Sequence, residues 1–67
     1  MDNDTLYNVF KVAIDKEYAA SEFYRKAAKD TANEEAKKLF EIFVVSELNH
    51  KNELEELYNA LKKDRGL

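Results

Sequence analysis

Residues 39–61 read LFEIFVVSELNHKNELEELYNAL, and the spacing of their apolar side chains decides the fold. Steps of three and four residues follow one stripe along a helix. Here the stripe holds five large apolar residues, which we expect in the core, interrupted by one glutamate and the only histidine of the chain. Its members are Phe40, Phe43, Glu47, His50, Leu54, Leu57 and Leu61. A carboxylate among apolar side chains is costly unless it is paired, protonated or bound to a metal, so Glu47 and His50 need a chemical explanation.

An earlier stretch of the chain carries a second stripe with the same spacing. Most of its members are apolar or aromatic, but Glu17 in the middle is again acidic. The members are Leu6, Phe10, Ala13, Glu17, Ala20, Tyr24 and Ala27. Further apolar residues widen this surface, namely Val9, Val12, Ile14 and Phe23. A helix with so wide an apolar surface is expected to face more than one neighbour.

The two stripes are separated by a short break at residues 29–33, which read KDTAN. Thr31 followed three residues later by Glu34 has the form of a capping box, which would start the second helix. Asn33 is a rival cap for the same helix. A break this short makes the two helices antiparallel neighbours.

Candidate capping residues also mark the outer ends of the two helices. Those before the first stripe are Asp2, Asn3 and Asp4. Gly66 is the expected stop signal of the second helix, and the chain has no proline and no other glycine to interrupt either helix. We therefore predict one all-α domain, residues 1–67, as an antiparallel hairpin with helices over about 4–29 and about 33–63.

The two acidic interruptions lie at matching distances from the break. Glu17 lies 13 residues before Asp30, and Glu47 lies 14 residues after Asn33. At roughly 1.5 Å of rise per residue, both are about 20 Å from the turn. In an antiparallel hairpin they are expected at the same level, with His50 one turn further along.

Composition excludes several classes of protein. With 67 residues the chain is a small domain, which usually needs disulfides, a metal or self-association, and it has no cysteine. A net charge of −3 with interspersed signs is not the footprint of a nucleic-acid binder. No long apolar run predicts a membrane span, and the N-terminal MDNDTLYN does not have the charge of a signal peptide. A cytoplasmic protein is expected.

A hairpin leaves one apolar face open, and the simplest cover is a second copy related by a two-fold axis, which gives a four-helix bundle. The dimer would gather two copies each of Glu17, Glu47 and His50. A glutamate from two helices and a Glu-x-x-His from the other two form the ligand set of a carboxylate-bridged di-iron centre. Manganese and zinc accept the same ligands. Three residues outside the main stripe indicate a broad dimer surface or higher assembly, namely Ile42, Val45 and Leu48.

The segment AIDKEYAASEFYRKAAKDTANEEAKKLFEIFVVSELNH, residues 13–50, resembles the first helical pair of rubrerythrin-like members of the ferritin-like superfamily. The resemblance rests on Glu17, on the Phe23-Tyr24 pair that follows it, on the short acidic turn and on Glu47-x-x-His50. It implies a ferritin-like four-helix bundle, with Glu17 and His50 as terminal metal ligands and Glu47 as the ligand that bridges two metals.

The chain also departs from that family. Ordinary rubrerythrins carry two such helical pairs and a cysteine-rich electron-donating module, whereas this sequence has one pair and no cysteine. In this respect it is similar to the encapsulated ferritins, which implies oxidation of Fe²⁺ by dioxygen at a site shared by two subunits. The terminal KKDRGL shows no evident tail that would target an encapsulin-type shell, and the sequence does not exclude that the chain is a fragment.

The expected function is therefore a ferroxidase-type oxidoreductase in iron storage or oxidative-stress protection, with two iron ions per homodimer and Glu17, Glu47 and His50 as catalytic metal ligands. Two alternatives stay open: a non-catalytic metal-stabilised dimer, and a metal-free helical dimer with a buried polar network. Tyr24 is either a hydrogen-bond partner of a ligand carboxylate or a core tyrosine. Glu53 either flanks a metal entry path or is a solvated surface residue.

Overall fold

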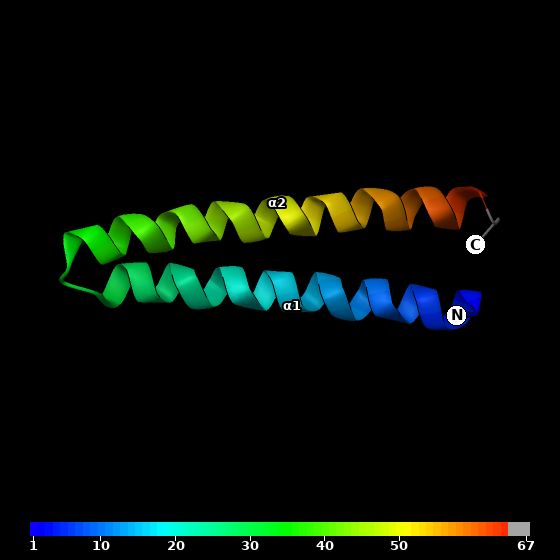
Figure 1. The fold of residues 1–67 in the computed structure, drawn as a ribbon, viewed down its shortest axis with the longest axis horizontal. Helices are drawn as coiled ribbons and strands as arrows, with labels where there is room; N and C mark the ends of the chain where they lie inside the picture. The colour runs from blue at the N-terminus through cyan, green and yellow to red at the C-terminus, as the bar shows by residue number, and fades with distance from the viewer. Residues whose placement is uncertain (65–67) are drawn as a thin grey trace.

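The fold is an antiparallel pair of long helices, seen in a computed structural model that describes residues 1–64. Helix α1 spans Asn3–Asp30 and helix α2 spans Glu34–Asp64. The predicted ranges, about 4–29 and about 33–63, differ from these by one residue at each end. The helices lie side by side along an elongated molecule of 49 × 16 × 15 Å, with the turn at one end (Figure 1). The all-α hairpin is confirmed, and the expected stop at Gly66 lies outside the described residues.

The N-terminus of α1 is capped by Asp2. Its Oδ1 accepts a hydrogen bond of 2.7 Å from the backbone N–H of Thr5, and Asp4 adds negative charge in the first turn. This contact satisfies one of the free N–H groups at the helix start. The hydrogen bond from Thr5 lowers the pKa of Asp2 below its ordinary value.

The turn shows that the predicted capping box is wrong. Asn33 caps α2, because its Oδ1 accepts a hydrogen bond of 2.8 Å from the N–H of Ala36. Thr31 instead closes α1: its N–H donates to the carbonyl of Ala27 at 3.0 Å. The Thr31 hydroxyl accepts the N–H of Asn33 at 3.1 Å. It is therefore used within the turn and does not reach the first turn of α2.

The contact between the helices follows a heptad in α1. Tyr7, Ser21 and Ala28 are buried, and Ile14 between them is half-buried. A seven-residue spacing keeps these side chains on one line facing α2. Ser21 is fully buried, with 0% exposure, and its hydroxyl donates to the Tyr18 carbonyl at 2.6 Å.

The predicted stripes lie beside this contact line and are only partly covered. In α1 all seven stripe residues are half-buried. In α2 Leu57 is 53% exposed, so it does not lie in the core of the single chain, and its burial in a four-helix bundle stays a prediction. The other large apolar residues exposed in the described chain are Met1, Val9, Val12, Tyr18, Phe23, Leu39, Ile42 and Val45. Two helices can each cover only one side of the other, so a wide apolar surface remains open.

Aromatic side chains form one cluster on each side of the middle of the hairpin. Toward the turn, Tyr24 packs against Phe23, Phe40 and Phe43 with ring centroids 5.1 to 6.2 Å apart. Offset and edge-to-face contacts of this kind stabilise beyond the area they bury. Toward the open end, the Tyr58 ring packs against the rings of Tyr7 and Phe10. The ammonium group of Lys62 lies over the Tyr58 ring in a cation–π contact.

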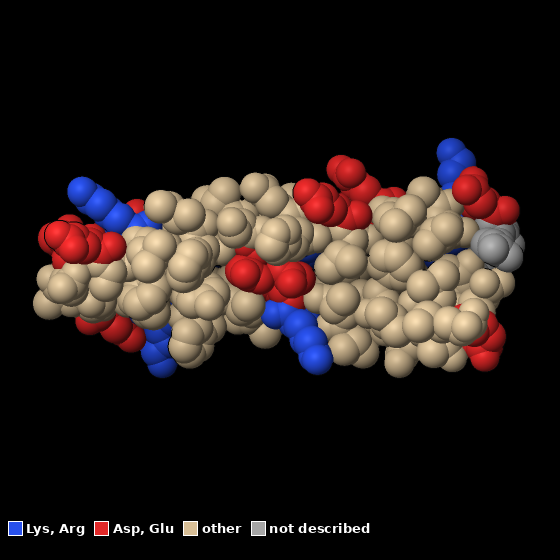
Figure 2. All heavy atoms as spheres, in the orientation of Figure 1, with Lys and Arg blue, Asp and Glu red and all other residues tan. Residues whose placement is uncertain are grey.

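The face seen in Figure 2 is mostly uncharged, with acidic atoms in the seam between the helices near mid-length and charges of both signs toward its margins. Neither helix of the described chain is long and apolar enough to cross a membrane.

Candidate metal centre

Three predicted site residues come together halfway along the hairpin. Glu17 lies on α1, and Glu47 and His50 lie one turn apart on α2. One ligand atom from each lies within 4.8 Å of the other two. We call these three residues the Glu–Glu–His cluster. The common level follows from the antiparallel turn, because the two helices rise equally from it.

Glu17 carries an unsatisfied polar atom inside this cluster. Its Oε2 has almost no contact with solvent and no hydrogen-bond partner, although His50 Nδ1 lies 3.3 Å away. The Glu17 side chain is 26% exposed and that of His50 is 58% exposed. A buried carboxylate oxygen without a partner is costly, and a cation would satisfy it. His50 marks the open side of the cluster.

The nearby Glu17 carboxylate changes the pKa of Glu47. A hydrogen bond with Glu17, available only when Glu47 is protonated, raises the pKa of Glu47 above its ordinary value. Partial desolvation and the negative charge of Glu17 raise this pKa further, whereas His50 lowers it. The two carboxylates therefore favour a proton, or another positive charge, between them.

Comparison with known proteins assigns this sequence to a family. The profile of the rubrerythrin family matches residues 8–67, which include the whole cluster. The chain belongs to the rubrerythrin family. No match was found among curated proteins or among solved structures. Membership of the rubrerythrin family together with the helical fold supports a ferritin-like, iron-binding protein, whereas the similarity to encapsulated ferritins stays a prediction.

The donor set of this rubrerythrin-family chain fits a divalent metal. Carboxylate oxygens are hard ligands, and a neutral imidazole suits iron, manganese and zinc. Two ligands on opposite sides of such an ion lie roughly 4.2 Å apart, from metal–ligand bonds of about 2.1 Å. The limit of 4.8 Å within the cluster is close to that spacing, so small side-chain rotations bring the atoms into range. Metal binding would stabilise the Glu17 Oε2 atom most, because this atom is buried and has no hydrogen bond.

A groove of about 410 Å³ leads from the cluster to the surface. We call it the site groove. It is lined by Phe10, Glu17, His50, Glu53, Leu54 and Leu57. Glu47 belongs to the Glu–Glu–His cluster but does not line this groove.

Tyr24 lies toward the turn, in the aromatic cluster with Phe40 and Phe43. No hydrogen bond joins its hydroxyl to a carboxylate of the Glu–Glu–His cluster within residues 1–64. Its packing fits a core tyrosine, and a hydrogen bond to a ligand stays a prediction.

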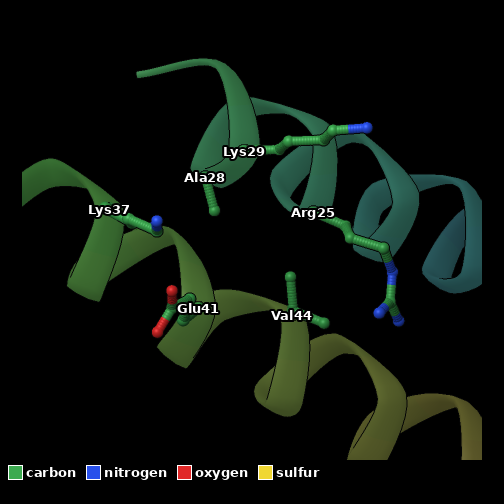
Figure 3. Close-up of a pocket in the computed structure, with 6 residues that line it drawn as sticks. All are labelled: Arg25, Ala28, Lys29, Lys37, Glu41 and Val44. Atoms are coloured by element: carbon green, nitrogen blue, oxygen red, sulfur yellow. The ribbon is translucent and has the colours of Figure 1, made fainter. Parts of the chain in front are cut away.

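Another groove, of about 420 Å³, lies near the turn but lacks convergent chemistry. It is lined by Arg25, Ala28, Lys29, Lys37, Glu41 and Val44. Ala28 and Val44 point into it, whereas the Arg25 and Lys29 side chains extend away from each other (Figure 3). Arg25 is also paired with Glu22 at 3.4 Å. This groove offers neither a set of metal ligands nor a nucleophile with its base.

Proposed function

We propose that this protein is a di-iron ferritin-like protein with ferroxidase-type activity, at a site shared between two copies of the chain. The observation that carries the proposal is the buried Glu17 Oε2, which has no hydrogen bond and lies beside Glu47 and His50. A role in iron storage or oxidative-stress protection in the cytoplasm follows from this activity.

A second copy would complete a two-metal centre, because one chain supplies only two carboxylates and one imidazole. Those three ligands could hold one metal with open coordination positions, whereas a two-fold dimer offers four carboxylates and two imidazoles for two metals. The half-buried stripes beside the cluster and the exposed Leu57 give the second copy an apolar surface to cover. Association of two copies would therefore complete the set of metal ligands and bury the apolar stripes at the same time.

Each ligand has a distinct role in this proposal. As the family resemblance implies, Glu47 would be the ligand shared by the two metals, and Glu17 and His50 would each hold one metal. Four carboxylate charges in the dimer would balance two divalent ions. Bound iron supplies one electron per ion to dioxygen or peroxide, the oxidation of Fe²⁺ that the family resemblance implies.

Anaerobic reconstitution with Fe²⁺ tests the proposal. About one tightly bound iron per chain in a species of two chains, followed by ferric absorbance on exposure to dioxygen or peroxide, is expected. Glu47→Ala should release the metal, and Glu41→Ala on the same helix, outside the cluster, should retain it. Stoichiometric iron without ferric absorbance, or no bound iron in a stable dimer, would contradict ferroxidase function.

A non-catalytic metal site is the second candidate, and the thin core favours it. Only Tyr7, Ser21 and Ala28 are buried among the described residues, so a metal that binds only the folded dimer would add needed stability. In that case Zn²⁺ or Mn²⁺ would drive dimerisation as well as Fe²⁺ does, and no oxidant would be consumed.

A further inference from the structure

The site groove contains one charged side chain that the proposed centre does not use. Glu17 and His50 belong to the Glu–Glu–His cluster, and three of the remaining lining residues are apolar. The sixth is Glu53, an exposed carboxylate on α2. A carboxylate among apolar walls, beside an opening to a cluster of metal ligands, is placed where an approaching cation would meet it.

The position of Glu53 on α2 continues the line of ligands outward. It lies three residues after His50, which lies three residues after Glu47. Side chains three residues apart share one face of a helix, with Cβ atoms about 5–6 Å apart. Exposure increases along this line, from the half-buried Glu47 to the exposed His50 and Glu53. The three residues therefore form a row along one face of α2, from the exposed Glu53 to the half-buried Glu47.

Glu53 is one of several acidic residues that no basic side chain neutralises in the described part of the chain. Lys51 pairs with Glu55, and Arg25 pairs with Glu22. Within residues 1–64, no lysine or arginine pairs with Glu53. Its negative charge is therefore available to an incoming cation, and low-dielectric groove walls strengthen that attraction relative to open solvent.

We infer that Glu53 captures Fe²⁺ at the exposed edge of the site groove, before the second copy covers the Leu57 side of that groove, and transfers it to His50 and Glu17. This inference rests on the proposed function, because it concerns the route of its metal substrate. A single carboxylate holds a divalent ion weakly, which allows rapid transfer to the three-ligand cluster. Glu53 therefore acts on the rate of metal uptake, and the final affinity belongs to Glu17, Glu47 and His50.

Uptake of Co²⁺ by the full chain tests this inference without any oxidation step. Stopped-flow absorbance follows entry of Co²⁺ into the centre, and equilibrium titration counts the ions bound per chain. Glu53→Gln should slow uptake by about fivefold or more at low ionic strength, with stoichiometry unchanged. Glu53→Asp, which keeps the charge, should restore most of the rate. Added salt should slow the unsubstituted protein more than Glu53→Gln.

Glu56→Gln is the matched control, because Glu56 is an exposed glutamate of α2 outside the site groove. Equal uptake rates for the Glu53→Gln and Glu56→Gln variants would overturn the inference. Loss of bound Co²⁺ in Glu53→Gln would also overturn it, because Glu53 would then be a permanent ligand. Absence of Co²⁺ binding in the unsubstituted protein, with Glu47→Ala behaving identically, would instead overturn the proposed function and the inference with it.

Discussion

At the residue scale, the pair Glu17 and Glu47 is a source of conflict in the metal-free chain. Their carboxylate atoms fall within the 4.8 Å limit of the cluster, and one oxygen of Glu17 has neither solvent nor a hydrogen bond. Proximity and partial desolvation both disfavour two negative charges at this place. A bound divalent cation reverses the sign of the interaction, so the arrangement that costs stability without metal contributes stability with it.

The raised pKa of Glu47 predicts how the metal-free protein responds to pH. Folded Glu47 holds its proton more tightly than the unfolded chain does, whose glutamates titrate near pH ~4.3. Its stabilising contribution is therefore present below that pH and is lost as the pH rises through the raised pKa. Glu47→Gln removes this loss. In chelator-treated protein, Glu47→Gln should therefore become more stable relative to the unsubstituted protein as the pH rises from about 4 to about 7, as measured by the free energy of unfolding.

Urea denaturation across that pH range measures the difference. Glu41→Gln is the control, since Glu41 lies on the same helix outside the Glu–Glu–His cluster. Parallel pH profiles for the unsubstituted protein and Glu47→Gln would show that the two carboxylates do not interact in the folded state. With excess metal the order should reverse, because only the unsubstituted protein gains from binding, by about 2.7 kcal/mol at a hundred times the dissociation constant.

At the element scale, α1 carries two overlapping stripes. The stripe predicted from sequence includes Leu6 and runs through half-buried residues such as Glu17. The buried contact line runs beside it through Tyr7, Ser21 and Ala28. Apolar spacing alone does not say which of the two lines faces α2. The structure assigns the line of Tyr7 to α2 and leaves the line of Leu6 half-buried. A helix with two neighbours shows both patterns at once, so sequence predicted the helix better than its partner.

Ser21 allows close packing of α1 on α2, one turn from Glu17. It is fully buried, and its hydroxyl is satisfied by the Tyr18 carbonyl. Ser21→Leu should destabilise the hairpin by about 1–3 kcal/mol through overpacking and should weaken metal binding as the helices separate. Ser21→Ala, which keeps the volume small, should change stability by less than about 1 kcal/mol. Thermal unfolding and metal titration measure both effects, and equal behaviour of the two variants would show that side-chain size is unimportant here.

The start of α2 shows why the capping residue was mispredicted. Thr31 and Asn33 both offer a side-chain oxygen, and the choice depends on backbone geometry in a three-residue turn. Asn33→Ala should destabilise the protein by about 1 kcal/mol, because the N–H of Ala36 loses its acceptor. Thr31→Ala should cost less, since it removes only the contact within the turn. Denaturation midpoints compare the two, and a larger loss for Thr31→Ala would contradict the assignment of the cap.

At the scale of the whole molecule, the sequence predicts that the residues of the Glu–Glu–His cluster lie at the same height in the hairpin. It does not predict which apolar residues are buried within one chain and which are left for a second copy to bury. Rise per residue and one short turn suffice to align Glu17 with Glu47. Leu57 was expected in the core because apolar periodicity does not distinguish burial within a chain from burial between chains. Its 53% exposure shows that two helices alone do not enclose the apolar stripe of α2. Burial of the remaining apolar surface depends on assembly with a second chain.

Leu57 therefore provides the test of the shared site. It lines the site groove and is exposed in the single chain, so the proposed dimer should bury it. Leu57→Asp places a charge in that interface and should weaken dimerisation by at least about 2 kcal/mol, roughly thirtyfold in the dissociation constant. Asn59→Asp, an exposed position of α2 outside the groove, adds the same charge and should leave the dimer intact. Sedimentation equilibrium with and without Fe²⁺ measures both.

Because each copy holds only half of the ligands, Leu57→Asp should lose iron together with the dimer while circular dichroism still reports helix. Retention of iron by a monomeric Leu57→Asp variant would show that one chain completes the metal site alone, and the shared centre would be wrong.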